Sequence, residues 1–258
     1  MLMILSPAKT LNFEKVHSQL SYTTPRFVKE ASQVMKELKK YSPPELESLM
    51  KINSKLSELN FKRNLAWSKE HSLENSKQAL FCFDGAVYHG FAADSLKEEH
   101  IAFAQQHVRI LSGLYGMLRP LDLIEPYRLE MGIKLPVKNN NNLYEFWKDA
   151  LLEYFNKEMK LQKEQVLVNL ASKEYYSAID MKKLGGKVVT PIFKDYNHGK
   201  YKIVAIYAKR ARGLMARYIS ENKIESAEEL KNFDLEGYEF DEKLSDDENL
   251  IFTRVSRF

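Results

Sequence analysis

The sequence predicts an α/β fold in which a mixed sheet is surrounded by helices. Short strand-like runs interleave with helical patterns along the chain, which is typical of this class. The 258 residues can bury a large core, and 44% of them are hydrophobic. Because no repeat or convincing linker divides the sequence, we predict one domain covering residues 1–258.

The first half opens with an apolar run, residues 1–5, which predicts a strand. Thr24 and Pro25 form a cap and first-turn signal for a helix that extends to about residue 40. The other elements expected here are a helix over residues 42–59, a strand over residues 81–88 with a turn at Asp84-Gly85, and a helix over residues 100–111.

The second half is expected to begin with an amphipathic helix over residues 143–159, which carries Tyr144, Phe146 and Trp147. A strand over residues 165–171 leads to a helix capped at Ser172. The remaining elements are strands over residues 187–193, 200–207 and 250–255, with a turn at residues 197–199 and a helix over residues 207–219.

Residues 207–219 (YAKRARGLMARYI) combine an apolar stripe with a strongly basic opposite side. The small residues Gly213 and Ala216 lie between the cations, so a polyanion could approach this face closely. Arginine suits phosphate because its planar guanidinium binds two oxygens at once. A solvated outer face is the alternative interpretation. The four cations of this segment are Lys209, Arg210, Arg212 and Arg217.

Charge is unevenly distributed along the chain. Residues 225–249 contain eleven acids and two lysines, a net charge of −9, whereas the whole chain carries +4. The rest of the protein therefore carries +13, which favours a polyanionic partner, chiefly nucleic acid. We interpret the acidic segment as a solubilising edge; a mobile competitor for the basic surface is the alternative.

Two observations indicate a cytoplasmic protein. Cys82 is the single cysteine, so no internal disulfide can form, and its apolar neighbours predict a buried thiol of raised pKa. No apolar run approaches the roughly 20 residues that cross a bilayer, and the N-terminus lacks a cationic leader pattern. We expect no membrane association.

Two further segments have candidate binding residues. The first predicted strand ends in Ser6-Pro7-Ala8-Lys9-Thr10, which offers Lys9 and Thr10 at a sheet edge without the glycines of a P-loop. In residues 111–135, Gly113 and Gly116 flank an apolar pair and suggest a helix-hairpin-helix-like turn that binds phosphate through backbone N–H groups. A buried turn is the alternative. The cations that follow are Arg119, Arg128 and Lys134.

Several long motifs resemble those of the YaaA family of peroxide stress proteins. They are SPAKT (residues 6–10), LSGLYGMLRPLDL (111–123), PYRLEMG (126–132), LYEFW (143–147), NLASKEY (169–175) and YAKRARGLMARY (207–218). The resemblance covers nearly the whole chain. It implies an α/β domain of unusual topology with a basic cleft and a helix-hairpin-helix-like element that binds duplex DNA. It also implies protection from hydrogen peroxide by lowering iron-driven DNA damage.

The resulting hypothesis is a DNA-binding protein without catalytic residues. It would bind double-stranded DNA mainly through phosphates that contact residues converging on one cleft. These residues are Lys9, Thr10, Gly113, Gly116, Arg119, Arg128, Lys134, Lys209, Arg210, Arg212 and Arg217. No metal ligand pattern is visible among the histidines, so we predict no metal site and no cofactor. Oligomeric state is left open.

Two alternatives remain from the sequence. One is an enzyme acting on a phosphate-bearing nucleotide or nucleic-acid end, in which Asp84 or Glu130 is the general base or magnesium ligand. Because Glu130 lies two residues from Arg128, a salt bridge is its simpler role. The other alternative is direct iron sequestration by carboxylates, which sequence spacing does not reveal.

Overall fold

The predicted mixed sheet is confirmed by the computed structural model, which describes residues 1–14, 20–197 and 199–255. Within these residues, eight strands form one sheet in the order β11-β12-β9-β8-β1-β5-β6, with β10 paired to the far end of β9. The five strands from β12 to β5 are mutually parallel, and β6, β10 and β11 are antiparallel to their neighbours. The strands are β1 (Leu2–Leu5), β5 (Val108–Ser112), β6 (Gly116–Leu118), β8 (Val166–Leu170), β9 (Lys187–Asn197), β10 (Lys200–Lys202), β11 (Glu239–Phe240) and β12 (Asn249–Val255).

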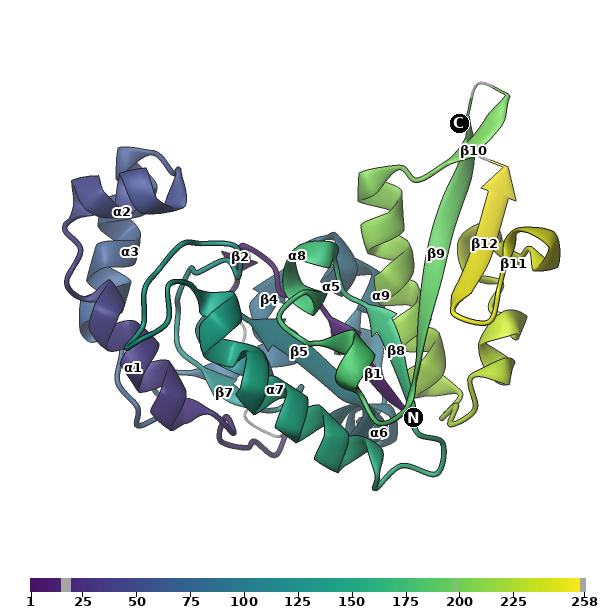
Figure 1. Cartoon of the computed structure of the whole chain (residues 1–258), viewed down its shortest axis with the longest axis horizontal. Coiled ribbons are helices and arrows are strands. Elements are labelled where there is room, and N and C mark those ends of the chain that lie inside the picture. Colours follow the sequence, from purple (N-terminus) through teal and green to yellow (C-terminus); the bar gives the residue numbers. More distant parts are fainter. Residues whose placement is uncertain (15–19, 198, 256–258) are drawn as a thin grey trace.

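Helices cover both faces of this sheet in a single compact domain (Figure 1). Helix α7 lies on one face, and α5, α6 and α9 lie on the other (Figure 1). The α-helices are α1 (Val28–Leu38), α2 (Pro43–Met50), α3 (Ser54–Ala66), α4 (Ala79–Cys82), α5 (Ala86–Phe91), α6 (Glu98–His107), α7 (Leu143–Met159), α8 (Lys173–Tyr176) and α9 (Ala205–Glu221). Short 3₁₀ turns are η1 (Ala93–Ser95), η2 (Met181–Lys183), η3 (Glu228–Asn232), η4 (Leu235–Gly237) and η5 (Glu242–Leu244).

Two small antiparallel pairs lie outside the large sheet. Strand β2 (Thr10–Leu11) pairs with β4 (Phe83–Asp84), and β3 (Lys77–Gln78) pairs with β7 (Leu123–Ile124). The first pair continues directly from the loop after β1, so it fixes the position of Lys9 and Thr10.

The centre of the sheet is apolar because both of its faces are covered. Every residue of β1, β5 and β8 is buried, including Arg109 and Asn169. Parallel strands that are covered on both sides are typically continuous apolar runs rather than alternating ones. This explains why residues 1–5 and 165–171 were predictable as strands.

The connections of β1 and β8 diverge at the carboxyl ends of these neighbouring strands. From β1 the chain goes on to β5 on one side, and from β8 it goes on to β9 on the other. Such a topological switch point is where open α/β sheets usually bind their ligands.

Helix α9 confirms the basic helix predicted over residues 207–219, but its small residues have another role. Gly213 and Ala216 are buried, and a Cβ on Gly213 would lie 1.8 Å from the Val87 carbonyl oxygen of α5. Gly90 of α5 faces α9 equally closely. The prediction that Gly213 and Ala216 open this helix to a polyanion is therefore wrong, because they let two helix backbones touch.

Two expected elements break where local polar or packing signals override periodicity. The helix expected over residues 42–59 is two helices, because Lys51 adopts a left-handed conformation and the Asn53 side chain caps α3 by accepting the Leu56 N–H. The strand expected over residues 81–88 is wrong: the segment comprises the end of α4, the short β4 and the first turn of α5.

The other two corrections concern helix boundaries. The helix expected over residues 100–111 ends at His107, because Val108–Ser112 is the buried strand β5 beside β1. The strand expected over residues 200–207 ends at Lys202, and α9 begins at Ala205. The turn expected at residues 197–199 includes position 198, which lies outside the described residues.

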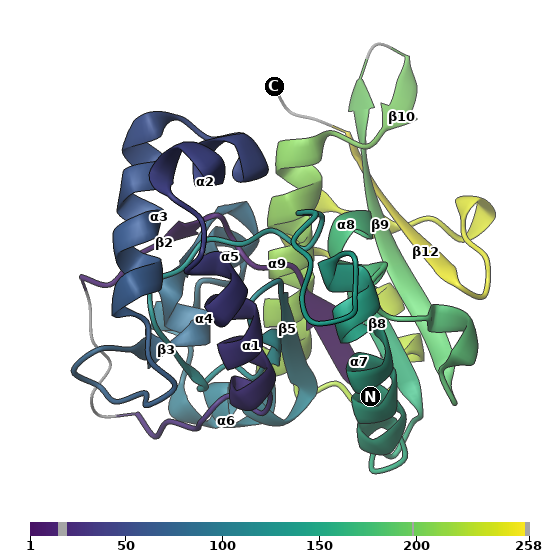
Figure 2. The same cartoon turned by 60° about the vertical axis from the view of Figure 1, so that its left-hand side comes forward.

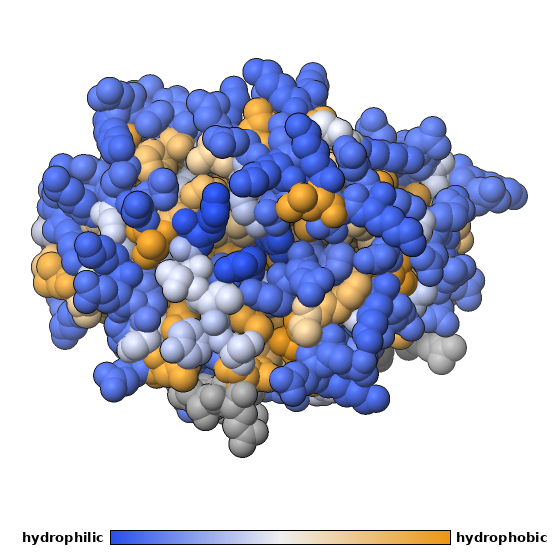
Figure 3. All heavy atoms as spheres, turned by 90° about the horizontal axis from the view of Figure 1, so that it is seen from below, coloured by the Kyte–Doolittle hydropathy of each residue, from blue (hydrophilic) through white to orange (hydrophobic). Residues whose placement is uncertain are grey.

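The molecule has two projecting parts at opposite ends. Helices α2 and α3 extend from one end, and the end of β9 with β10 extends from the other (Figures 1 and 2). On the face seen from below, hydrophobic residues lie in small groups among hydrophilic ones (Figure 3). Within the described residues, we find no helix that is both long and apolar enough to span a membrane.

A buried histidine at the end of α6, His107, makes the stability of the protein depend on pH. His107 is 6% exposed, its Nδ1 lies 2.8 Å from the Met1 carbonyl oxygen, and burial lowers its pKa. In the unfolded chain it takes a proton near pH 6.5. We therefore expect the free energy of unfolding to fall as the pH drops from about 7 to about 5. Urea unfolding at several pH values measures this loss.

The matched variant for this prediction is His107→Asn, which keeps a donor close to the Nδ1 position and removes the titration. It should show a smaller loss of stability between about pH 7 and pH 5 than the original chain. An equal loss in both proteins would contradict the role of His107.

Candidate functional site

The loops that follow β1 and β8 are joined at the switch point. The Ser172 N–H donates to Ser6 Oγ at 2.8 Å, and the two hydroxyls lie 3.2 Å apart. The Tyr88 hydroxyl donates to the Ser6 carbonyl oxygen from the buried side. These bonds hold the SPAKT loop in a fixed position above the sheet.

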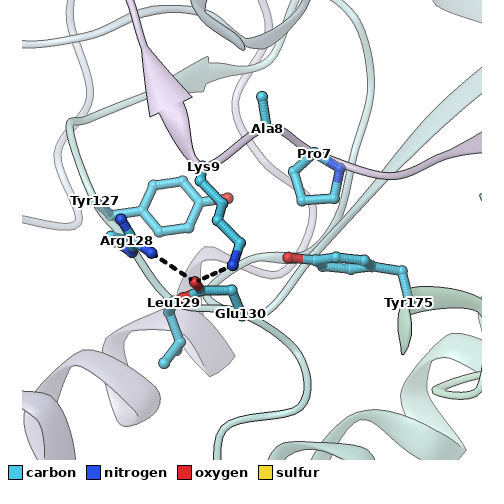
Figure 4. Close-up of a pocket in the computed structure, with 8 residues that line it drawn as sticks. All are labelled: Pro7, Ala8, Lys9, Tyr127, Arg128, Leu129, Glu130 and Tyr175. Atoms are coloured by element: carbon cyan, nitrogen blue, oxygen red, sulfur yellow. Dashed lines mark hydrogen bonds and ion pairs between the residues drawn. The ribbon is translucent and has the colours of Figure 1, made fainter. Parts of the chain in front are cut away.

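Lys9 and Arg128 meet at one carboxylate beside this loop (Figure 4). Lys9 Nζ lies 3.2 Å from Glu130 Oε1, and Arg128 Nη2 lies 3.0 Å from the same oxygen. Glu130 is only 7% exposed, whereas the Lys9 side chain is 66% exposed. The salt-bridge role predicted for Glu130 is confirmed. Two cations share one anion, so the group keeps a net charge of +1.

A small pocket opens beside this group, lined also by Tyr127 and Tyr175 (Figure 4). Its free volume of about 10 Å³ has room for roughly one water molecule. Glu130 Oε2 and Arg128 Nε are buried and have no hydrogen-bond partner among the described residues. One water could satisfy both atoms, since one of them accepts and the other donates. The interior is thus too small for a nucleotide, and any large anion must bind at its exposed mouth.

Arg212 approaches the same edge of the sheet from α9. It interacts electrostatically with Tyr176 of α8, the residue after the pocket residue Tyr175, and burial lowers the pKa of its guanidinium. No carboxylate among the described residues pairs with it. We call Lys9, Arg128 and Arg212 the carboxyl-end cluster, because they surround the carboxyl ends of β1 and β8.

Other predicted cations are engaged elsewhere. Arg119 follows β6 and binds the buried Asp122. Arg210 binds Glu236 of the acidic segment at 2.6 Å. The acidic segment therefore packs against α9 at this point and neutralises one of its cations.

Arg217 has a structural role at the end of α5. It donates to the carbonyl oxygens of Phe91 and Ala92 and pairs with Glu221. These carbonyls are the unpaired acceptors at a helix C-terminus, where a cation is favoured. Arg217 thus ties α9 to α5 rather than projecting toward solvent.

The helix-hairpin-helix-like element is not present at residues 111–118. Gly113 and Gly116 lie in the turn of a β-hairpin between β5 and β6, and both are buried. A Cβ at Gly113 would lie 2.4 Å from the Leu129 carbonyl oxygen, and one at Gly116 would lie 2.6 Å from the Trp147 ring. The alternative of a buried turn is therefore correct, because strands continue the chain on both sides. The backbone of this turn faces protein instead of solvent.

The remaining predicted residues are accessible. Thr10, Lys134 and Lys209 are exposed, and neither lysine has a carboxylate partner in the described part of the chain. Thr10 is opposite Asp84 across the β2–β4 pair. Lys209 lies one turn before Arg212 on α9, so it extends the cluster toward the N-terminus of that helix.

Asp84 lies at an open cleft with a volume of about 410 Å³. Asp84 Oδ1 lies 2.6 Å from His89 Nε2, and Asn12 and Ser95 line the same cleft. Cys82 is buried beneath this region, and burial raises the pKa of its thiol as predicted. Within the described residues, no group of three or more metal-binding side chains is close enough to hold an ion.

Sequence reasoning missed Tyr127, Tyr175 and Ser172 as parts of the site. Tyr127 is adjacent to Arg128, and Ser172 and Tyr175 follow directly after β8. Their position after a buried parallel strand was the available signal, since such loops meet those of neighbouring strands.

Comparison with known proteins gives consistent matches over almost the full length. A family profile described as "Peroxide stress protein YaaA" matches residues 1–244. A UPF0246 protein of Flavobacterium johnsoniae is 50% identical over 254 residues, which cover 98% of this chain and 100% of the relative. UPF0246 proteins of Janthinobacterium sp. and Shewanella sediminis are 47% and 46% identical, covering 98% of this chain and 98% and 99% of the relatives.

Proposed function

Because this chain belongs to the YaaA family of peroxide stress proteins, we propose that it binds double-stranded DNA during peroxide stress and limits iron-driven damage there. The carboxyl-end cluster is the proposed contact, with Lys209 beside it. The single observation that supports this most is that Lys9 and Arg128, distant in the sequence, meet at Glu130 beside the loop after β1, while Arg212 interacts electrostatically with Tyr176 in the helix after β8.

The charges of the cluster favour an extended polyanion. Lys9 is mostly exposed and Arg128 is partly exposed, while Glu130 neutralises one of these two charges. Arg212 keeps its full charge without a carboxylate partner in the described residues, and desolvated cations attract anions more strongly than solvated ones. DNA phosphates spaced along a backbone can contact several of these side chains at once.

Binding of this kind is independent of base sequence and steeply dependent on salt. If roughly five phosphates are contacted, the logarithm of affinity falls with the logarithm of salt concentration with a slope of about −4 to −5. The expected effect of Arg212→Gln is weaker binding to all duplex sequences alike, with a slope reduced by about 1. Fluorescence anisotropy with labelled duplexes at several salt concentrations measures both quantities.

Two variants make this experiment specific. Lys160→Gln changes an exposed cation after α7, at the opposite end of the sheet, and should leave affinity unchanged. Glu130→Gln removes the competing carboxylate and should strengthen binding. A salt-independent affinity, or equal losses in Arg212→Gln and Lys160→Gln, would rule out the cluster as the contact.

The enzyme alternative is favoured by one observation, the Asp84–His89 pair beside the 410 Å³ cleft. A carboxylate that orients a histidine is a common arrangement for general-base catalysis. We therefore include nucleotides and magnesium in the same samples. Turnover that is lost in Asp84→Asn and kept in Arg212→Gln would favour an enzyme acting on a phosphate-bearing substrate.

A further inference from the structure

Three side chains form an exposed row across the end of the sheet. Val255 of β12 pairs with Tyr196 of β9, and Tyr196 pairs with Tyr201 of β10. Directly paired residues project from the same face, so the three lie side by side. They are 66%, 41% and 39% exposed, respectively. The two tyrosine rings lie 5.3 Å apart at an interplanar angle of 68°. This end of the sheet extends past the helices (Figures 1 and 2).

Lysines lie around this row. Lys194 lies two residues before Tyr196 on the same face of β9, whereas Lys200 and Lys202 flank Tyr201 in β10 and so project from the opposite face at the strand edge. All three lack a carboxylate partner within the described ranges. The one acid of the two strands, Asp195, points to the other face, where it is buried against Arg254 and Tyr238. The row is therefore aromatic, with Lys194 as the cation on its own face and two further lysines at the adjacent strand edge.

Pairing with a second copy through the strand edge does not fit this surface well. Strand β10 is only three residues long and carries a lysine on each side of its tyrosine, an arrangement that blocks edge-to-edge pairing of sheets. Exposed aromatic side chains on a sheet face, with lysines around them, instead match the way proteins hold single-stranded nucleic acid. There, unpaired bases stack on the rings and the cations contact the flanking phosphates.

We propose that the row of Val255, Tyr196 and Tyr201 binds the unpaired bases of single-stranded nucleic acid, while Lys194 on the same face holds an adjoining phosphate. This inference rests on the proposed DNA binding. Together the two predict that the preferred ligand is a duplex with a single-stranded tail.

The test compares anisotropy of a blunt duplex, the same duplex with a short DNA tail, and the same duplex with an RNA tail. We expect the tailed duplex to bind at least about fivefold more tightly than the blunt one, since one stacked base contributes this much or more. Combined Tyr196→Ala and Tyr201→Ala should abolish the difference. Combined Tyr196→Phe and Tyr201→Phe should keep it, because the rings remain. The RNA arm identifies which single strand is preferred.

Tyr22→Ala is the matched control, since Tyr22 is 53% exposed in another part of the chain. Far-ultraviolet circular dichroism establishes that each variant folds. Blunt-duplex binding without any tail preference, or a preference kept in the alanine variant, would overturn the inference and leave the proposed function intact. Binding of the tailed duplex without binding of the blunt duplex would support the inference and contradict the proposed function. A molar mass by light scattering that falls in the alanine variant would show a contact between copies, and so overturn the inference.

Discussion

Gly213→Ala is expected to lower the free energy of unfolding by about 3 kcal/mol, at the upper end of the usual cost of overpacking. The new Cβ would lie 1.8 Å from the Val87 carbonyl oxygen and 2.8 Å from the Phe91 backbone nitrogen. Both are backbone atoms of α5, so no side-chain rotation relieves the clash. The roughly 1 kcal/mol that alanine gains over glycine in a helix does not offset this cost. Urea unfolding measures the difference.

Gly185→Ala is the matched control for the helix crossing. A Cβ there would meet only the Asn156 side-chain oxygen at 3.5 Å, an ordinary contact. This variant should stay within about 0.5 kcal/mol of the original chain. If Gly213→Ala were equally mild, α5 and α9 would have to be farther apart than the structure places them.

Asp195→Ala should destabilise the protein by about 3–5 kcal/mol, because it leaves a buried charge without its partner. Asp195 is 1% exposed and accepts hydrogen bonds from Arg254 Nε and the Tyr238 hydroxyl. After the substitution, the guanidinium of Arg254, whose side chain is 14% exposed, lacks its closest anion. Thermal or urea unfolding measures the loss.

The reason for this loss can be tested separately from its size. The double variant Asp195→Leu with Arg254→Met removes both charges and should recover much of the stability. Asp149→Ala changes an exposed aspartate on α7 and should have little effect. A double variant as unstable as Asp195→Ala would mean that packing, not an unpaired charge, explains the result.

The central strands and long helices could be predicted from the sequence because their signals are local. Residues 1–5 and 165–171 are continuous apolar runs, and helix α7 matches its predicted range of residues 143–159. The end of α6 could not be predicted in this way. Val108–Ser112 continues the helical pattern as well as it forms a strand, and only the neighbouring strand β1 decides between them.

The candidate site was predictable in its residue types but not in its pairings. The motifs identified Lys9 and Arg128, and the fold brings these two together at Glu130. Sequence spacing could not show that Arg217 caps α5 or that Glu236 neutralises Arg210, since these contacts join distant segments. The two glycines at residues 113 and 116 indicated a tight turn correctly, but their flanking strands depend on the sheet around them.

The Glu130 carboxylate occupies the place that a phosphate oxygen would take between Lys9 and Arg128. In the proposed function, this carboxylate competes with the bound phosphate for the two cations. A lone inorganic phosphate would have to displace it by itself, whereas a polymer that also touches Arg212 and Lys209 would spread the cost over several contacts. The proposed contact would therefore disfavour small, abundant anions and favour multivalent ones.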